Sequence, residues 1–236
     1  MHVWQEDLLT DLENTESEEV LFGRLAKIAY DLGFDHFAYG LRQPIALAQP
    51  KVVMLNNYPD AWKMRYMERN YVAIDPTVHH GTHSVMPLVW TERIFQPERE
   101  FWEEARSFGL NVGWAQSSRD MQGVSGMLTL ARSTELLTSN ELDDKGYKMI
   151  WLTQITHQLM AKKLVEPAVT DENALSGREL EVLRWTAEGK TSGEISMIMN
   201  ITERTVNFHI NNCMRKLDVT NKTSAAVKAA LLGLLS

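Results

Sequence analysis

The 236-residue chain has almost no cysteine, no long apolar run and no excess of positive charge. Its single cysteine, Cys213, rules out an internal disulfide and suits a reducing compartment. The lack of an apolar run of membrane-spanning length argues against a transmembrane helix. The acidic first residues, MHVWQED, are unlike a signal peptide, which begins with basic residues. We therefore expect a cytoplasmic protein that makes no membrane contact.

Signatures of catalysis are also missing, because the chain shows no nucleophile–base pair and no glycine-rich cofactor loop. The paired acids at 103–104 and 143–144 fall on predicted helix surfaces, where neighbouring side chains point apart. His79, His80 and His83 lie in a segment that we expect to be a loop, and no spaced acid or cysteine completes a metal set. We expect no enzyme activity, no metal site and no cofactor.

The net charge of −7 is unevenly distributed along the chain. Residues 171–236 contain eight Lys and Arg and eight Asp and Glu, so the whole negative charge lies in the preceding part. An acidic front part discourages non-specific contact with nucleic acid. Any affinity for DNA must therefore come from a local basic patch in the neutral C-terminal part, and from two copies acting together.

Start signals near the C-terminus predict three short helices in succession. Residues 176–179 and 191–194 each have the Ser/Thr-x-x-Glu spacing of a capping box. Asn200 supplies a turn, and Thr202 caps a third helix that runs to about Leu217. Three short helices with a tight turn between the last two are typical of a helix-turn-helix.

The third helix has two contrasting faces. A buried stripe is predicted at Val206, Ile210, Cys213 and Leu217, whereas Phe208 falls on the exposed side. The opposite face carries Arg and Asn, which can pair with guanine and adenine in the major groove. Lys, Thr, Ser and His side chains nearby can hold phosphates. The predicted DNA-binding set is Lys190, Thr191, Ser192, Arg204, Thr205, Asn207, His209, Asn211, Arg215, Lys216 and Lys222. The alternative is a solvated polar face on a small helical domain.

The boundary between the two parts is a stretch of chain breakers. Residues 151–164 have helical periodicity, and the following EPAVTDEN has no apolar rhythm. We predict domains at 1–164 and 176–236, joined by a linker at 165–175.

The front part alternates helix and strand patterns. Helices are predicted at 18–32, 60–69, 97–108 and 142–163, and strands at 36–42, 51–55, 111–118 and 124–132. This order predicts an α/β fold, an α-β-α sandwich with an antiparallel sheet, beside an all-α helix-turn-helix domain. A further helix at 6–12 is expected to lie N-terminal to these elements.

One segment of the front part combines aromatic rings with an acid. Tyr58, Trp62, Tyr66 and Trp90 offer apolar walls with polar tips, which suit an amphipathic ligand. Asp75 lies between Ile74 and Pro76, where a buried carboxylate needs a hydrogen-bond donor. A core aromatic cluster in which Asp75 caps a turn fits the same residues, so both interpretations stay open at this point.

The chain resembles the LuxR-type quorum-sensing regulators from about residue 18 to Leu235. In the front part the resemblance rests on Tyr58-x-x-x-Trp62, Tyr66, Asp75-Pro76, Trp90 and Gly113. In the C-terminal part it rests on LRWTAEGKT at 183–191, Glu194-Ile195 and TVNFH at 205–209. Response regulators of the NarL type share the C-terminal half alone, but the acidic set of their receiver domain is not visible here.

The resemblance implies that the ligand is an N-acyl-homoserine lactone. Trp62 would donate to the lactone carbonyl and Asp75 would accept the amide N–H. Tyr58 and Thr129 would donate to the amide carbonyl, and many family members have serine at the position of Thr129. The predicted set is completed by Tyr66, Thr77, Val78, Trp90, Phe101, Leu110 and Met127 near the ring, and by Gly40, Arg42, Met54 and Asn56 toward the acyl tail.

The family also implies a homodimer that binds a palindromic promoter site and activates transcription with RNA polymerase as a further partner. Ile150, Leu152, Ile155 and Leu159 would form one apolar face for self-association, and Ala226, Ala229, Ala230 and Leu234 of the last helix would form another. Two alternatives remain: a regulator of the same fold that responds to another ligand, or one that the lactone releases from DNA.

Overall fold

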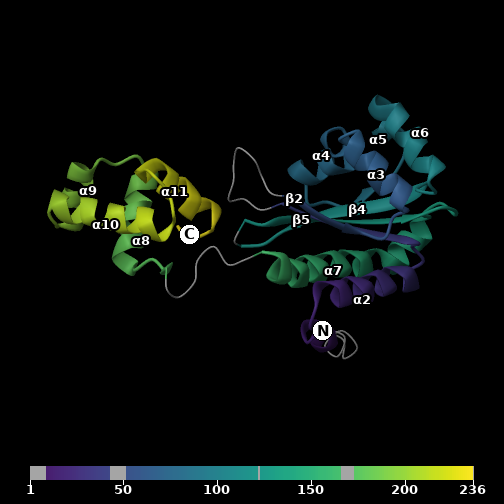
Figure 1. Ribbon diagram of the computed structural model, residues 1–236, viewed down its shortest axis with the longest axis horizontal. Helices are drawn as coiled ribbons and strands as arrows, with labels where there is room; N and C mark the ends of the chain where they lie inside the picture. Colours follow the sequence, from purple (N-terminus) through teal and green to yellow (C-terminus); the bar gives the residue numbers. More distant parts are fainter. Residues whose placement is uncertain (1–8, 43–51, 122, 166–172, 236) are drawn as a thin grey trace. The chain divides into compact units, whose positions relative to one another are not determined.

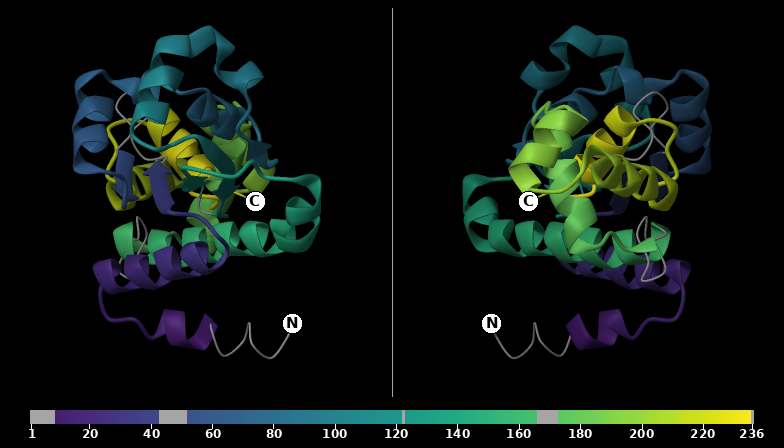
Figure 2. Two further views of the ribbon diagram at one scale, coloured as in Figure 1. Left: turned by 90° about the vertical axis from the view of Figure 1, so that its right-hand side faces the viewer. Right: turned by 90° about the vertical axis from the view of Figure 1, so that its left-hand side faces the viewer.

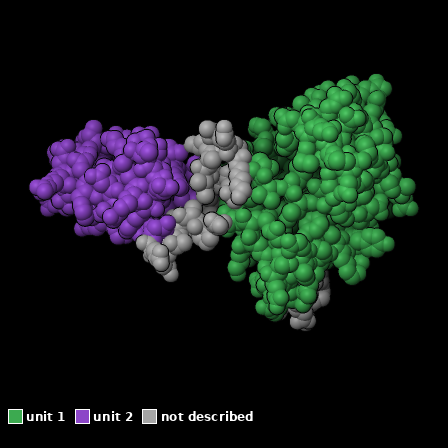
Figure 3. Space-filling view, viewed as in Figure 1, with its two compact units in different colours: residues 1–42, 51–120, 124–165 green, residues 43–50, 121–123, 166–236 purple. Residues whose placement is uncertain are grey.

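The computed structural model describes residues 9–42, 52–121, 123–165 and 173–235. The chain forms two compact units (Figure 3). Unit 1 comprises residues 1–42, 51–120 and 124–165, and unit 2 comprises residues 43–50, 121–123 and 166–236. No helix among the described residues has both the length and the apolar character that a membrane span requires.

Unit 1 is built on a five-stranded antiparallel sheet with the order β2-β1-β5-β4-β3. The strands are β1 (His36–Arg42), β2 (Val52–Asn56), β3 (Leu88–Val89), β4 (Val112–Arg119) and β5 (Ser125–Arg132). One face is covered by α2 (Glu18–Asp31) and α7 (Ser139–Leu164), which lie side by side (Figures 1 and 2). The other face carries α3 (Asp60–Glu68), η1 (Tyr71–Ala73), α4 (Pro76–His83), α5 (Glu92–Phe95), η2 (Gln96–Glu98) and α6 (Arg99–Ser107). The predicted α-β-α sandwich is confirmed.

Side chains on one face of the sheet form a packed core, and those on the other face point toward the layer of short helices. Phe37, Tyr39 and Leu41 of β1 are buried against α2 and α7, together with Leu128 and Leu130 of β5. Because successive side chains of a strand point to opposite faces, residues 38, 40 and 42 face the layer of short helices instead. Arg132 and Glu141 form a buried ion pair at the edge of this core, in which Arg132 donates two hydrogen bonds to Glu141.

Two expectations for unit 1 need correction. The segment with His79, His80 and His83 is the helix α4 and not a loop, because Asp75 caps it and Pro76 occupies its first turn. The helix expected from residue 97 begins as the 3-10 turn η2, and α6 starts only at Arg99. The helix expected at 6–12 falls partly outside the described residues.

A third correction concerns the apolar face predicted on α7. Leu152, Ile155 and Leu159 are buried in the core of unit 1, so they are not available for self-association. Ile150 is exposed on the same helix, and so is Tyr147. Of the four residues predicted on α7, Ile150 is therefore the one that a second copy could reach. Ala226 and Ala229 of the other predicted face are buried as well.

Residues 173–235 of unit 2 form four helices: α8 (Gly177–Ala187), α9 (Ser192–Met199), α10 (Glu203–Lys216) and α11 (Lys222–Leu231). Both predicted capping boxes are present, at Ser176 with Glu179 and at Thr191 with Glu194. Asn200 adopts a left-handed conformation with φ of 52°, which turns the chain between α9 and α10. The helix-turn-helix is confirmed.

Candidate ligand cavity and nucleic-acid interface

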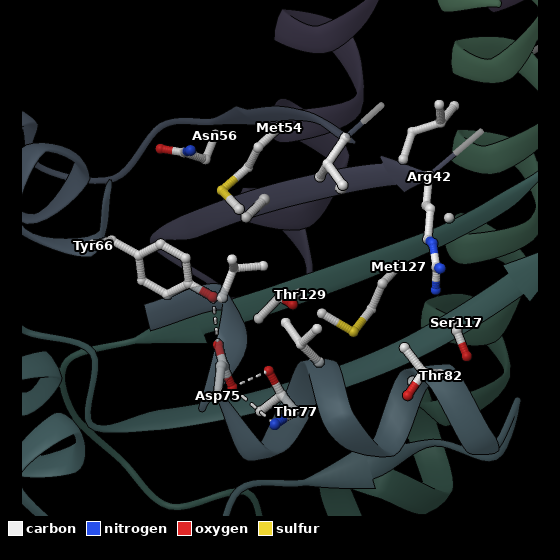
Figure 4. Close-up of a pocket in the computed structure, with 18 of the residues that line it drawn as sticks. Arg42, Met54, Asn56, Tyr66, Asp75, Thr77, Thr82, Ser117, Met127 and Thr129 are labelled. Carbon is white, nitrogen blue, oxygen red and sulfur yellow. Dashed lines mark hydrogen bonds between the residues drawn. The ribbon is translucent and has the colours of Figure 1, made fainter. Parts of the chain in front are cut away.

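A cavity of about 910 Å³ lies between the sheet of unit 1 and the helices α3, α4 and α6 (Figure 4). All fifteen residues of the predicted ligand set line it, although they come from segments up to 90 residues apart. The cavity also includes residues that sequence reasoning missed, namely Thr82, Ser84, Ser117, Ser118, Arg119 and Ser125. Strand alternation could have indicated Ser117, Arg119 and Ser125, which share one face of β4 and β5, but it gives no signal for Thr82 and Ser84, which lie in and just after α4.

Asp75 forms the polar anchor of the cavity wall and is only 9% exposed. Its Oδ1 accepts hydrogen bonds from the backbone N–H and the hydroxyl of Thr77, at 2.8 and 2.7 Å. Its Oδ2 accepts one from the Tyr66 hydroxyl at 3.0 Å. Burial raises the pKa of the Asp75 carboxyl above its ordinary value, and the bonds from Thr77 and Tyr66 oppose that rise.

The two carboxylate oxygens are used unequally, because Oδ1 accepts two hydrogen bonds from Thr77 and Oδ2 accepts one from Tyr66, while the Val78 backbone N–H also acts on the carboxylate. A carboxylate offers about four lone-pair sites, and Oδ2 accepts only the Tyr66 hydroxyl from the described residues. Asp75 is thus both the cap of α4 and a wall residue with a spare acceptor. The capping alternative and the ligand alternative from the sequence are compatible with one another.

Aromatic rings surround this carboxylate. Trp62, 2% exposed, lies 5.8 Å from Tyr66 and 5.9 Å from Phe101 between ring centroids. Burial and the nearby charge of Asp75 raise the pKa of the Tyr58 hydroxyl, so that group stays a neutral donor. Neither the Trp62 indole N–H nor the Tyr58 hydroxyl forms a hydrogen bond with any described residue, so both donors are available in the wall.

The position of the Trp90 ring depends on the absence of a side chain at Gly113. Its backbone N–H donates to the carbonyl of Gly113 at 2.8 Å, and its ring covers the space that a side chain at 113 would occupy. We expect Gly113→Ala to displace the Trp90 ring and to destabilise unit 1 by about 1–3 kcal/mol, because an added methyl overpacks the site. Thermal unfolding measures this loss. Gly146→Ala is the control, since an added Cβ there meets nothing within 4 Å, and equal melting of both variants would contradict the assignment.

The exposed face of α10 carries the predicted base-reading side chains. Arg204, Asn207, Asn211 and Arg215 are all exposed, and Phe208 beside them is 60% exposed. The opposite stripe of Val206, Ile210, Cys213 and Leu217 is buried, as predicted. Asn207 Oδ1 accepts a hydrogen bond from Ser192 Oγ at 2.8 Å, which ties the start of α9 to the middle of α10.

The predicted phosphate-binding residues differ in their availability. Thr191 and Lys222 are exposed, whereas Lys190, Ser192, Thr205 and His209 are half-buried. Lys216 is already engaged inside unit 2, where its ammonium donates to Glu179 Oε2 at 2.7 Å and to the Ala174 carbonyl at 2.8 Å. A phosphate would have to compete with the buried Glu179 carboxylate for this lysine.

Comparisons with known proteins agree with this geometry. Residues 17–160 match the family described as "Autoinducer binding domain", and residues 173–229 match "Bacterial regulatory proteins, luxR family". The chain is 53% identical to the transcriptional activator protein AnoR of Acinetobacter nosocomialis, over 100% of both chains.

Solved structures give the same result. The crystal structure of Escherichia coli SdiA has a TM-score of 0.84 and 34% identity, covering 99% of this chain and 98% of SdiA. SdiA in complex with octanoyl-rac-glycerol has a TM-score of 0.82 and 35% identity, covering 98% and 95%. The N-acylhomoserine lactone dependent factor CepR2 of Burkholderia cenocepacia has a TM-score of 0.63 and 31% identity, covering 69% of this chain and 96% of that one.

Proposed function

The chain belongs to the LuxR family of bacterial regulatory proteins and carries an autoinducer-binding domain, and from this premise we propose that its autoinducer is an N-acyl-homoserine lactone. The observation that carries the proposal is the spare acceptor of Asp75 beside two available donors. A lactone amide N–H needs an acceptor, and its two carbonyls need donors. The similarity to CepR2, a factor that depends on such a lactone, supports the choice.

Each polar group of the ligand head has a counterpart in the wall. Asp75 Oδ2 accepts the amide N–H. The Trp62 indole N–H donates to the lactone carbonyl, and Tyr58 and Thr129 donate to the amide carbonyl. The aromatic cluster around Trp62 and Phe101 encloses the ring, and the acyl tail extends over the sheet toward Gly40 and Met54.

Ligand binding stabilises the fold by linkage, since a molecule that binds only the folded state adds its binding free energy to stability. We further propose that two copies pair through exposed apolar side chains and bind a palindromic site, activating transcription with RNA polymerase.

The domain bounds proposed are 1–164 and 176–236, supported by the end of α7 at Leu164 and the start of α8 at Gly177.

A second candidate is a regulator of this fold that responds to a different amphipathic ligand. The SdiA complex with octanoyl-rac-glycerol supports this second candidate, because an acyl chain there is joined to a polar head other than a lactone. Mass measurement of the molecule extracted from the purified full chain separates the two: a homoserine lactone supports the first candidate, and an acylglycerol overturns it.

The helix-turn-helix makes a separable prediction about DNA. Asn207→Ala is expected to reduce discrimination between operator variants by about 1–3 kcal/mol, because a bidentate base contact is lost. Lys190→Ala is expected to weaken all sequences similarly and to lower the slope of log affinity against log salt by about one.

Fluorescence anisotropy with a set of single-base operator variants at several salt concentrations measures both effects. Asn212→Ala is the matched control, because this half-buried asparagine of α10 lies outside the predicted contact set. Uniform weakening by Asn207→Ala together with altered base preference in Lys190→Ala would reverse the roles assigned to these residues.

A further inference from the structure

The sheet presents its cavity-facing residues in three rows, set by strand register. Written across β2, β1, β5 and β4, the rows are Asn56–Ala38–Thr129–Ala115, then Met54–Gly40–Met127–Ser117, then Val52–Arg42–Ser125–Arg119. All of these residues except Ala115 line the cavity. The first row includes Thr129, the proposed donor to the amide carbonyl, so the acyl tail crosses the other two rows in turn.

Strand geometry converts these rows into lengths. Residues two apart in a strand are separated by about 6.6 Å, so the second and third rows lie about 6.6 and 13 Å from Thr129. An extended covalent chain advances about 1.2 Å per bond. A straight acyl tail therefore reaches the second row near its sixth or seventh carbon, and the third row near its twelfth.

Gly40 is the opening in the second row. Its neighbours across the strands are Met54 and Met127, whose side chains project from the sheet (Figure 4). On the far side of the row, α4 closes onto the sheet, because a Cβ at Gly81 would lie only 2.8 Å from Met127 Sδ. A Cβ at Gly40, by contrast, meets nothing within 4 Å. The tail thus passes over Gly40, between the two methionines.

The third row marks the end of the apolar surface that the acyl tail can cover. Arg42 and Arg119 are exposed, and Ser125 lies between them in register. A hydrocarbon end placed there would remove water from guanidinium and hydroxyl groups without replacing their hydrogen bonds, which is unfavourable. Longer tails gain nothing beyond this row.

We propose that Gly40 determines acyl-chain specificity, admitting tails of about ten to twelve carbons that end at the row of Arg42, Ser125 and Arg119. This inference rests on the proposed lactone function. Binding strengthens by about fourfold for each methylene buried before the third row and levels off after it. With valine at position 40, the same cavity ends at the second row and takes tails of about six carbons.

The test is a thermal-shift titration of the purified full chain with unsubstituted lactones of 4 to 14 acyl carbons. For the unaltered chain, the half-saturating concentration is expected to fall with tail length up to 10–12 carbons and to fall no further at 14. Gly40→Val is expected to weaken the 12-carbon lactone by about 1,000-fold or more, because five or six methylenes lose their burial, and to leave the 4- and 6-carbon lactones within threefold. Gly40→Ala should lie between the two, which keeps the test open if valine impairs folding.

The possible outcomes distinguish the role of Gly40 in chain-length preference from the lactone function itself. Equal weakening of all tail lengths by Gly40→Val, or an unchanged preference, would overturn the role of Gly40 while leaving the lactone function intact. No stabilisation of the unaltered chain by any lactone would overturn both.

Discussion

Asp75→Ala is expected to weaken lactone binding at least 100-fold. The substitution removes a charged acceptor that is only 9% exposed, and the ligand amide N–H is left buried without a partner. A hydrogen bond to a charged group contributes about 1.5–3 kcal/mol, and an unsatisfied buried donor costs about 1–3 kcal/mol. The half-saturating lactone concentration in thermal unfolding of the full chain measures the effect.

Because Asp75 also caps α4, alanine alone cannot separate binding from local folding. Asp75→Asn keeps an acceptor oxygen for Thr77 and replaces the other oxygen by an NH₂ group, which cannot accept an amide N–H. We expect Asn to preserve melting without ligand and to lose lactone response as alanine does. Asp60→Asn on the exposed start of α3 is the control. A normal dose response in Asp75→Asn would refute the assignment of the amide contact.

Glu179→Ala is expected to destabilise unit 2 by about 3–5 kcal/mol, which is most of the stability of a small domain. The Glu179 side chain is 5% exposed and accepts from Lys216 and from the Ser176 backbone N–H, both at 2.7 Å. Its removal leaves a partly buried ammonium without its partner and breaks the capping box of α8. Amide hydrogen exchange in α8 to α11 measures the loss locally.

The control for this effect is Glu181→Ala, since the exposed pair of Glu181 with Arg178 contributes little. A double substitution, Glu179→Leu with Lys216→Met, should recover much of the loss, because apolar groups can replace a buried pair of similar volume. Equal exchange in Glu179→Ala and Glu181→Ala would contradict a structural role for the buried pair.

The same pair gives unit 2 a defined pH dependence. Burial alone raises the pKa of Glu179, but the hydrogen bonds from Lys216 and Ser176 outweigh it and hold the pKa below its ordinary value. The stabilisation is therefore present above the pKa of the unfolded chain and is lost as the pH falls through the lowered pKa of the folded state.

The sequence predictions for unit 2 rested on helix-capping residues and on one turn residue. Ser176, Thr191 and Thr202 each form the cap that their spacing predicted, and Asn200 makes the left-handed turn. Such signals act within a few residues, so one sequence is enough to identify them. The capping role of Glu179 was likewise predicted, but its burial was not, because that depends on Lys216, 37 residues away.

Unit 1 shows the limit of such reasoning. The helix α4 was missed although Asp75-Pro76 is a start signal, with a capping side chain followed by proline in the first turn. The rows of the cavity could not be predicted, because they depend on the register of Gly40 against Met127 and Met54. Register across distant strands is set by packing of the whole sheet and not by local sequence.

The most direct test of the central claim is the melting temperature of the full chain, with and without a 12-carbon homoserine lactone, for the unaltered protein and for Asp75→Asn. A lactone that occupies the cavity raises the melting temperature of the unaltered protein with its concentration, and has little effect on Asp75→Asn. An unchanged melting temperature for the unaltered protein, or an equal rise in both proteins, would contradict a lactone held by Asp75.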